Sequence, residues 1–169
     1  VVQYLTAHTL KLVAILNTHL HFDHVLGNAD LAAATGAPIY ANNLDDFLVR
    51  PELSGSRFGL PDTPPFEHVD QEEGDLTLMG LACKVFHTPG HTPGSLSYYF
   101  PTAGAVFAGD VLFYRSVGRT DLPGGDFNTL RNAIRSKLFT LPAETVVYPG
   151  HGPATTVGDE QHGNPFLGI

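Results

Sequence analysis

The sequence predicts a single domain of the α+β class, and three observations support this expectation. The 169 residues are 43% hydrophobic, so the chain can bury enough apolar surface to form a packed core. Short apolar runs that are typical of buried strands are interspersed with short helical patterns. The chain also contains 18 glycines and 13 prolines, which indicates many tight loops and little long helix. We expect residues 1–169 to form one domain.

Apolar spacing and turn residues delimit the elements expected in the first half of the chain. Residues 28–35 are rich in alanine and end at Gly36, as a helix with a glycine stop would. Residues 50–70 hold four prolines and two glycines and predict a long irregular loop. The expected elements are the end of a helix over 2–9, a strand over 13–17, a helix over 28–35, a strand over 38–41 and a short helix over 43–49.

The second half predicts mostly strands. A turn is expected at Glu73-Gly74-Asp75, and a rigid loop at Thr88–Gly94. Asp126 is a candidate N-cap for a helix over 127–138, in which Leu130 and Ile134 recur at helical spacing. The expected strands are 76–78, 81–87, 95–100, 105–108 and 145–148.

Charge and composition exclude several classes of protein. Nine basic against 17 acidic residues give a net charge of −8, which argues against a nucleic-acid partner. No apolar run reaches the roughly 18 residues of a membrane span. A single cysteine, Cys83, cannot form an internal disulfide. The first residues show no targeting signal, so the expected location is the cytoplasm. The oligomeric state stays open.

The segment from His19 to His24, with the pattern H-x-H-x-D-H, is the main candidate for a functional site. His19 and His21 are two residues apart, so in an extended chain they point the same way and can bind one ion. Asp23 and His24 follow past a bend and can reach a second ion. Imidazole nitrogen and carboxylate oxygen suit borderline divalent ions, of which Zn²⁺ is the default candidate.

Three further candidates follow predicted strands. His91 lies in PGHTPG, Asp110 in FAGDV and His151 in YPGHGP. Strand ends converge at one edge of a sheet, and an aspartate can bridge two cations. Five histidines and two aspartates therefore suffice for two divalent ions, with zinc expected and iron or manganese as alternatives.

These motifs, in this order, resemble the metallo-β-lactamase superfamily over nearly the whole chain. The strings THLHFDH, HTPGHTPGS, FAGDVLF, GRTDLPGGD, YPGHGP and HGNPFL resemble its glyoxalase II branch, and within it the small single-domain hydroxyacylglutathione hydrolase-like proteins. The resemblance implies an αββα sandwich. It assigns His19, His21 and His91 to one metal, Asp23, His24 and His151 to the other, and Asp110 to both. Only 18 residues precede His19, so we expect an N-terminally incomplete domain without its first strands.

The expected function is hydrolysis of a small-molecule thioester, glyoxalase II-like, by a metal-bridging hydroxide. Asp23 and Asp110 are the expected catalytic residues: Asp110 bridges the metals, and Asp23 can pass on the proton of the water. A thiolate leaves without a separate general acid, because a thiol pKa is about 8.5. The acyl group and the thiol carrier stay open. The alternative is a mononuclear iron persulfide dioxygenase, in which two histidines and one aspartate hold the iron.

The remaining polar residues predict lesser roles. Arg119 and Asp121 predict either a salt bridge that stabilises a glycine-rich loop or a loop that lines the active site. Arg119 and Tyr114 are candidate substrate-lining residues. His87 is expected to support a ligand through a hydrogen bond rather than to bind metal, and Cys83 to be a small apolar residue of a strand.

Overall fold

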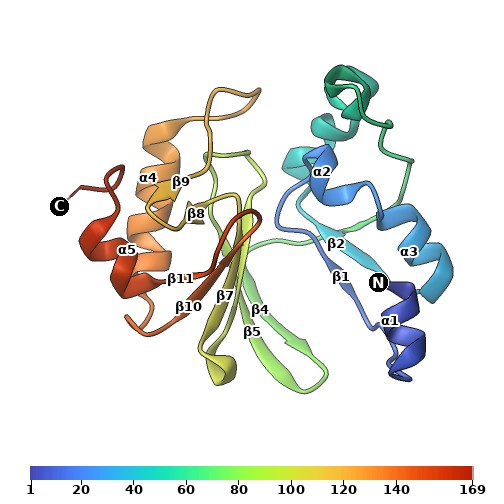
Figure 1. Ribbon diagram of the computed structural model, residues 1–169, viewed down its shortest axis with the longest axis horizontal. Coiled ribbons are helices and arrows are strands. Elements are labelled where there is room, and N and C mark those ends of the chain that lie inside the picture. Colours follow the sequence, from blue (N-terminus) through green and yellow to red (C-terminus); the bar gives the residue numbers. More distant parts are fainter. Residues whose placement is uncertain (169) are drawn as a thin grey trace. The chain divides into compact units, whose positions relative to one another are not determined.

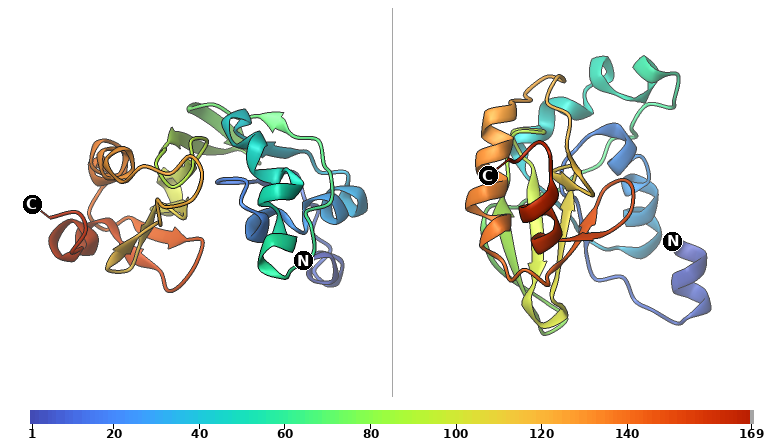
Figure 2. Two further views of the ribbon diagram at one scale, coloured as in Figure 1. Left: turned by 90° about the horizontal axis from the view of Figure 1, so that it is seen from above. Right: turned by 60° about the vertical axis from the view of Figure 1, so that its left-hand side comes forward.

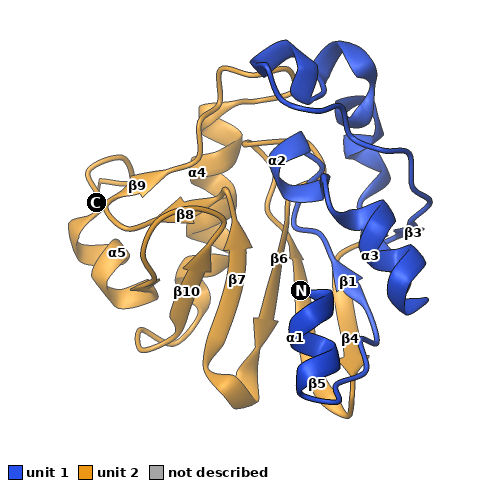
Figure 3. Cartoon of the chain, turned by 45° about the vertical axis from the view of Figure 1, so that its right-hand side comes forward, with its two compact units in different colours: residues 1–71 blue, residues 72–169 orange. Residues whose placement is uncertain are grey.

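The computed structural model describes residues 1–168, and the chain divides into two compact units, Val1–Gln71 and Glu72–Ile169 (Figure 3). Helices and strands occur in both units, as expected for the α+β class. That the units fold as one domain stays a prediction. None of the described helices is both long and apolar enough to cross a membrane.

Unit 1 is built around a parallel sheet with the strand order β1-β2-β3. Gly36 ends α3 in the left-handed conformation, with φ of 70°, as the glycine stop predicts. Leu20, Val25 and Leu48 are core residues of this unit. Its elements are α1 (Val2–Ala7), β1 (Ile15–Leu16), α2 (Phe22–Val25), α3 (Asn28–Thr35), β2 (Ile39–Ala41), the 3-10 helices η1 (Asn43–Val49), η2 (Pro51–Leu53) and η3 (Gly55–Phe58), and β3 (Val69–Asp70).

Unit 2 contains a six-stranded sheet with the order β11-β10-β7-β6-β5-β4 and a separate β8–β9 hairpin. Its elements are β4 (Gly74–Leu78), β5 (Leu81–His87), β6 (Leu96–Phe100), η4 (Pro101–Ala103), β7 (Ala105–Gly109), β8 (Leu112–Phe113), β9 (Ser116–Val117), α4 (Phe127–Ser136), η5 (Leu138–Thr140), β10 (Val146–Pro149), β11 (Thr155–Thr156) and α5 (Val157–Gly163).

Strand direction in this sheet determines where its loops emerge. Strand β6 is antiparallel to both β5 and β7, and β10 is parallel to β7. Strands β5, β7 and β10 therefore all run the same way, and the loops that follow them leave from the same edge of the sheet.

Helices α4 and α5 lie on the same side of this sheet (Figures 1 and 2). Asp126 caps α4 as predicted, because its Oδ1 accepts a hydrogen bond from the Thr129 amide at 2.7 Å. Leu130 and Ile134 are fully buried in one cluster with Val147 of β10. Burial of this apolar stripe against the strands stabilises the layer, since each large aliphatic side chain contributes about 1.5–3 kcal/mol.

Several elements differ from the sequence-based expectation. The turn expected at Glu73-Gly74-Asp75 is wrong: β4 already begins at Gly74, where it pairs with Val85. The tight turn is Met79-Gly80, and both residues have positive φ. Helix α4 ends at Ser136 rather than Leu138. Short elements with little apolar periodicity were not predicted, namely α2, β3, β8, β9, β11 and α5.

We predict that Ile134→Ala lowers the free energy of unfolding by about 2–5 kcal/mol, because it leaves a cavity in the unit 2 core. Ile134 is fully buried on α4. Urea denaturation followed by circular dichroism measures the change. Asn132→Ala, on the exposed face of the same helix, is the matched control and should stay close to wild type. Equal stability of the two variants would contradict the assigned core.

Glu73 links the start of β4 to the end of α4. Its carboxylate oxygens lie 2.6 and 2.8 Å from Lys137 Nζ, and Oε2 also accepts a hydrogen bond from the His87 amide. The hydrogen bond from Lys137 is the main cause that holds the pKa of Glu73 below its usual value. A carboxyl with a depressed folded-state pKa stabilises the protein above its unfolded pKa, and this contribution is lost as pH falls through the folded value.

Glu73→Gln should therefore lower the free energy of unfolding by less than about 1 kcal/mol at neutral pH, since the pair is partly exposed and screened by solvent. In acid, below the folded pKa of Glu73, the variant and wild type should converge. Urea titrations at both pH values test this, with the exposed Asp75→Asn as control. A deficit that persists in acid would show that the charge is not responsible.

Candidate metal centre

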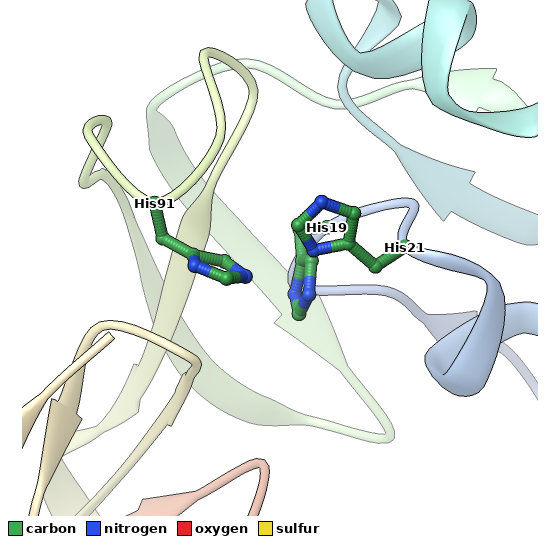
Figure 4. Close-up of side chains that lie close together, drawn as sticks. All are labelled: His19, His21 and His91. Atoms are coloured by element: carbon green, nitrogen blue, oxygen red, sulfur yellow. The ribbon is translucent and has the colours of Figure 1, made fainter. Parts of the chain in front are cut away.

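The four candidate ligands of unit 1 cluster between β1 and the end of α2. His21 is the N-cap of α2, and Asp23 and His24 lie within this single helical turn. The His19 ring is 5.0 Å from that of His21, at 90°, and 4.1 Å from that of His24, measured between centroids. Figure 4 shows His19 and His21 on this loop. The bend expected after His21 is thus a helical turn, and the clustering of these residues is confirmed.

Buried polar residues hold this loop in place. Asp45, which is fully buried on η1, accepts a hydrogen bond from the Leu20 amide at 3.3 Å. Asn28 donates to the side-chain oxygen of Asn17 at 2.8 Å. The Thr18 hydroxyl is 3.1 Å from His19 Nδ1, which orients the ring so that Nε2 is the atom offered to a ligand. Sequence reasoning missed Asp45, because no spacing distinguishes it from a surface acid.

The three candidate ligands of unit 2 follow the three strands that run in the same direction. His91 lies on the loop after β5 (Figure 4), Asp110 directly follows β7, and His151 follows β10. The Oδ2 atom of Asp110 is 3.7 Å from His91 Nε2 and 3.6 Å from His151 Nε2. The structure therefore brings together these three residues, as the strand-end layout predicts, with the carboxylate facing both imidazoles.

A main-chain contact orients His91. Its Nδ1–H donates a hydrogen bond to the Arg119 carbonyl at 2.8 Å. The carbonyl can only accept, so Nδ1 carries a hydrogen, and Nε2 is the ring nitrogen that faces Asp110. This role of the Arg119 backbone was missed, because a main-chain carbonyl leaves no signal in a residue pattern.

The side chain of Arg119 points elsewhere, into a bidentate ion pair with Asp121. Both N···O distances are 2.7 Å, and both side chains are more than half exposed. The hydrogen bond from Arg119 lowers the pKa of Asp121 to about 2. The predicted salt bridge is therefore present. Tyr114 lies at the exposed turn of the β8–β9 hairpin, and substrate contact by either residue stays a prediction.

Two glycines permit close approach of the chain around His91. A Cβ at Gly118 would overlap the Asp110 carbonyl oxygen and would lie 3.3 Å from the Cβ of His91. Gly90 has φ of +128°, and a Cβ there would overlap the backbone of Leu130. Both positions require glycine because the backbone, rather than a flexible side chain, occupies the space.

The remaining histidines and the cysteine have structural partners. His87 Nε2–H donates to the Pro93 carbonyl at 2.7 Å, within the loop that carries His91. His8 and His162 bond to carbonyls of their own helices, and His68 donates to Asp46. Cys83 is buried, and burial raises the pKa of its thiol to about 11, which disfavours a nucleophilic role.

The chemistry of this donor set fits divalent ions. Each of the seven residues offers one imidazole nitrogen or carboxylate oxygen. These are the donors that zinc and neighbouring transition metals accept in proteins, and two four-coordinate ions need about three protein ligands each. The supporting contacts to His19 and His91 are of the kind that orient metal-bound imidazoles.

Comparison with known proteins defines the class. The model of the metallo-beta-lactamase superfamily matches residues 5–151, so the chain belongs to this superfamily of metal-binding hydrolases, as its motifs predict, and has the metallo-beta-lactamase fold.

Three similar proteins cover most of the chain. It is 42% identical over 169 residues to "Probable metallo-hydrolase YqgX" of Bacillus subtilis, with 98% of this chain and 80% of the relative covered. It is 39% identical over 163 residues to "Hydroxyacylglutathione hydrolase GloC" of Haemophilus influenzae, with 94% and 77% covered. The crystal structure of TTHA1623 in a di-iron-bound form is similar with a TM-score of 0.89 and 43% identity, with 98% and 83% covered.

We predict that Gly118→Ala weakens metal binding, because the added methyl group would displace the backbone from Asp110 and pull the Arg119 carbonyl away from His91. A loss of about 10–100-fold is expected from the usual effect of disturbing groups that orient metal ligands. Competition with a chromophoric chelator measures the affinity. Gly168→Ala, where a Cβ meets nothing within 4 Å, is the control. Wild-type affinity of Gly118→Ala would contradict the proposed constraint.

Proposed function

We propose that the chain is a dinuclear metal-dependent hydrolase of S-acyl thioesters, of the kind that act on acylglutathiones. The observation that carries the proposal is the position of Asp110. Its Oδ2 faces the Nε2 atoms of His91 and His151 at 3.7 and 3.6 Å, which suits a carboxylate shared by two cations. The ring orientation that the Arg119 carbonyl imposes on His91 also supports a ligand role.

The proposed ligand sets combine residues of both units. One ion would take His19, His21 and His91, and the other would take Asp23, His24 and His151, with Asp110 shared. The order of these residues in the sequence and membership in the superfamily support this assignment. Zinc is the expected metal from the donor types, whereas the di-iron form of TTHA1623 supports iron as an alternative, and manganese remains a further one.

A pair of divalent cations, when bound, supplies Lewis acidity that makes water available as hydroxide and polarises an acyl carbonyl. The protein residues contribute orientation and proton handling. Asp110 and the five imidazoles would hold the two ions in a fixed arrangement, and the Asp23 carboxylate would accept the proton of the attacking water. A thioester suits this site because the leaving thiol has a pKa of about 8.5 and departs without a dedicated general acid.

The similarity to GloC, whose printed name is hydroxyacylglutathione hydrolase, supports an S-(hydroxyacyl)glutathione substrate. It does so at 39% identity over 94% of this chain. A small-molecule substrate also agrees with the net charge of −8, which disfavours a polyanionic partner.

Steady-state hydrolysis of S-D-lactoylglutathione by metal-reconstituted protein tests the proposal. Asp110→Asn should reduce kcat/KM by at least about 100-fold, since an amide binds cations more weakly than a carboxylate that is shared between them. The exposed Asp75→Asn should retain activity. Elemental analysis should find two metal ions per chain. Absence of turnover above free metal in fully loaded protein would reject thioester hydrolysis.

The same preparation tests the alternative oxidoreductase. If one iron per chain is found and glutathione persulfide drives oxygen uptake, the protein is a persulfide dioxygenase instead. If neither substrate reacts with fully loaded protein, another hydrolysable bond must be sought.

A further inference from the structure

A fully buried carboxylate in unit 2 lies outside the set of candidate ligands. Glu160 is on α5, and its side chain is 0% exposed. Its Oε1 accepts a hydrogen bond from the Thr155 hydroxyl at 2.7 Å, and its Oε2 accepts from Asn164 Nδ2 at 2.8 Å. A third donor, the amide of Arg115, lies 3.0 Å from Oε2. Burying a carboxylate is costly in free energy unless hydrogen-bond donors surround it, and these three donors offset that cost. What the donors belong to therefore indicates what Glu160 does.

The contacts of Glu160 converge on the turn of the β8–β9 hairpin. Arg115 has φ of +55°, a left-handed conformation that costs energy for a residue with a side chain. Glu160 binds the amide of this strained residue, and Asn164 binds the carbonyl of Ser116 at 2.9 Å. The Arg115 guanidinium also donates to the Asp159 carbonyl and lies where a Cβ of Gly163 would be. Helix α5 and the residue that follows it, Asn164, thus hold both the backbone and the side chain of this turn. Figure 1 shows α5 near the β8–β9 hairpin.

The hairpin begins and ends beside the candidate ligands. Asp110 is separated from β8 by Val111 alone, and Gly118 follows β9 directly. The Gly118 amide donates to the Val111 carbonyl at 3.3 Å, which closes the base of the hairpin. The next residue, Arg119, provides the carbonyl that orients His91. A displacement of the turn would therefore move Asp110 through β8. Through β9 it would move the Arg119 carbonyl and so disturb His91.

We propose that Glu160 is a positioning residue for the metal centre. It holds the β8–β9 hairpin and thereby fixes the Asp110 carboxylate and the orientation of the His91 ring. The inference rests on the proposed metal binding by these two residues. It assigns to Glu160 no contact with substrate or metal.

The pair Glu160→Ala and Glu160→Gln separates positioning from charge. Alanine removes both carboxylate acceptors and leaves the Arg115 amide without this hydrogen-bond partner. Glutamine can keep its oxygen towards Arg115 and Asn164 while its amide group donates to the Thr155 hydroxyl, which can act as an acceptor. Alanine should weaken zinc binding on the order of tenfold, the lower end of the range for groups that support ligands. Glutamine should restore most of the affinity.

Two further variants keep the test decisive. Val157→Ala removes a fully buried side chain from the same helix and leaves the hydrogen bonds between Glu160 and the hairpin in place, so it controls for loss of packing. Thr155→Val removes one hydrogen bond to Glu160 with little change in volume. If Glu160→Ala does not fold, Thr155→Val should still show a smaller loss of zinc affinity in the same direction.

A second readout uses metal-free protein and does not depend on activity. Nitrogen-15 NMR of the histidine side chains detects a ring N–H that is held in a hydrogen bond. Wild type, Glu160→Gln and Val157→Ala should show the Nδ1–H of His91 bonded to the Arg119 carbonyl, whereas Glu160→Ala and, more weakly, Thr155→Val should lose this signal.

The outcomes of this experiment are distinct from those of the thioesterase assay. The positioning role would be overturned if Glu160→Ala and Val157→Ala, at equal loss of Tm, had the same zinc affinity and the same His91 Nδ1–H signal. Wild-type protein that binds no metal would reject the proposed function, while the His91 Nδ1–H signal would still decide whether Glu160 positions this residue.

Discussion

The shared direction of β5, β7 and β10 is the constraint on which the cluster of candidate ligands in unit 2 depends. Because β6 returns between β5 and β7, and β10 joins β7 in parallel, three loops leave one edge of the sheet. His91, Asp110 and His151 are far apart in the sequence and belong to these three loops. A change in the direction of one strand would move its ligand to the opposite edge of the sheet, whatever the residues in the loop.

Both units support their candidate ligands with a fully buried carboxylate that is not itself a candidate. Asp45 accepts a hydrogen bond from the amide next to His19, and Glu160 accepts one from the turn between Asp110 and Gly118. In each case the acid accepts a hydrogen bond from a backbone amide of the loop or turn. Such contacts define the path of a loop, and the imidazoles and carboxylates then follow from that path. Dense buried hydrogen bonding of this kind restricts loop motion more than surface ion pairs do.

The candidate ligands could be identified from the sequence because four of them form the pattern H-x-H-x-D-H and the other three follow apolar runs. The helix over α4 was also predictable, because Asp126 and the spacing of Leu130 and Ile134 are local signals. The start of β4 and the elements β8, β9 and α5 could not be predicted from the sequence. Pairing with Val85 extends β4 through Gly74, and contacts with Glu160 stabilise the hairpin. These are tertiary interactions between residues distant in sequence, and they override local propensity.

The hydrogen bond from His91 to the Arg119 carbonyl has a consequence for natural variation at this position. The atom that accepts the hydrogen bond from His91 belongs to the main chain, whereas the Arg119 side chain forms an ion pair with Asp121 on the surface. The side chain at position 119 can therefore change while the backbone carbonyl still accepts the hydrogen bond from His91, provided that Gly118 keeps the backbone in the same conformation. Variability in a protein family need not mark a residue as dispensable when its contribution is made by the backbone.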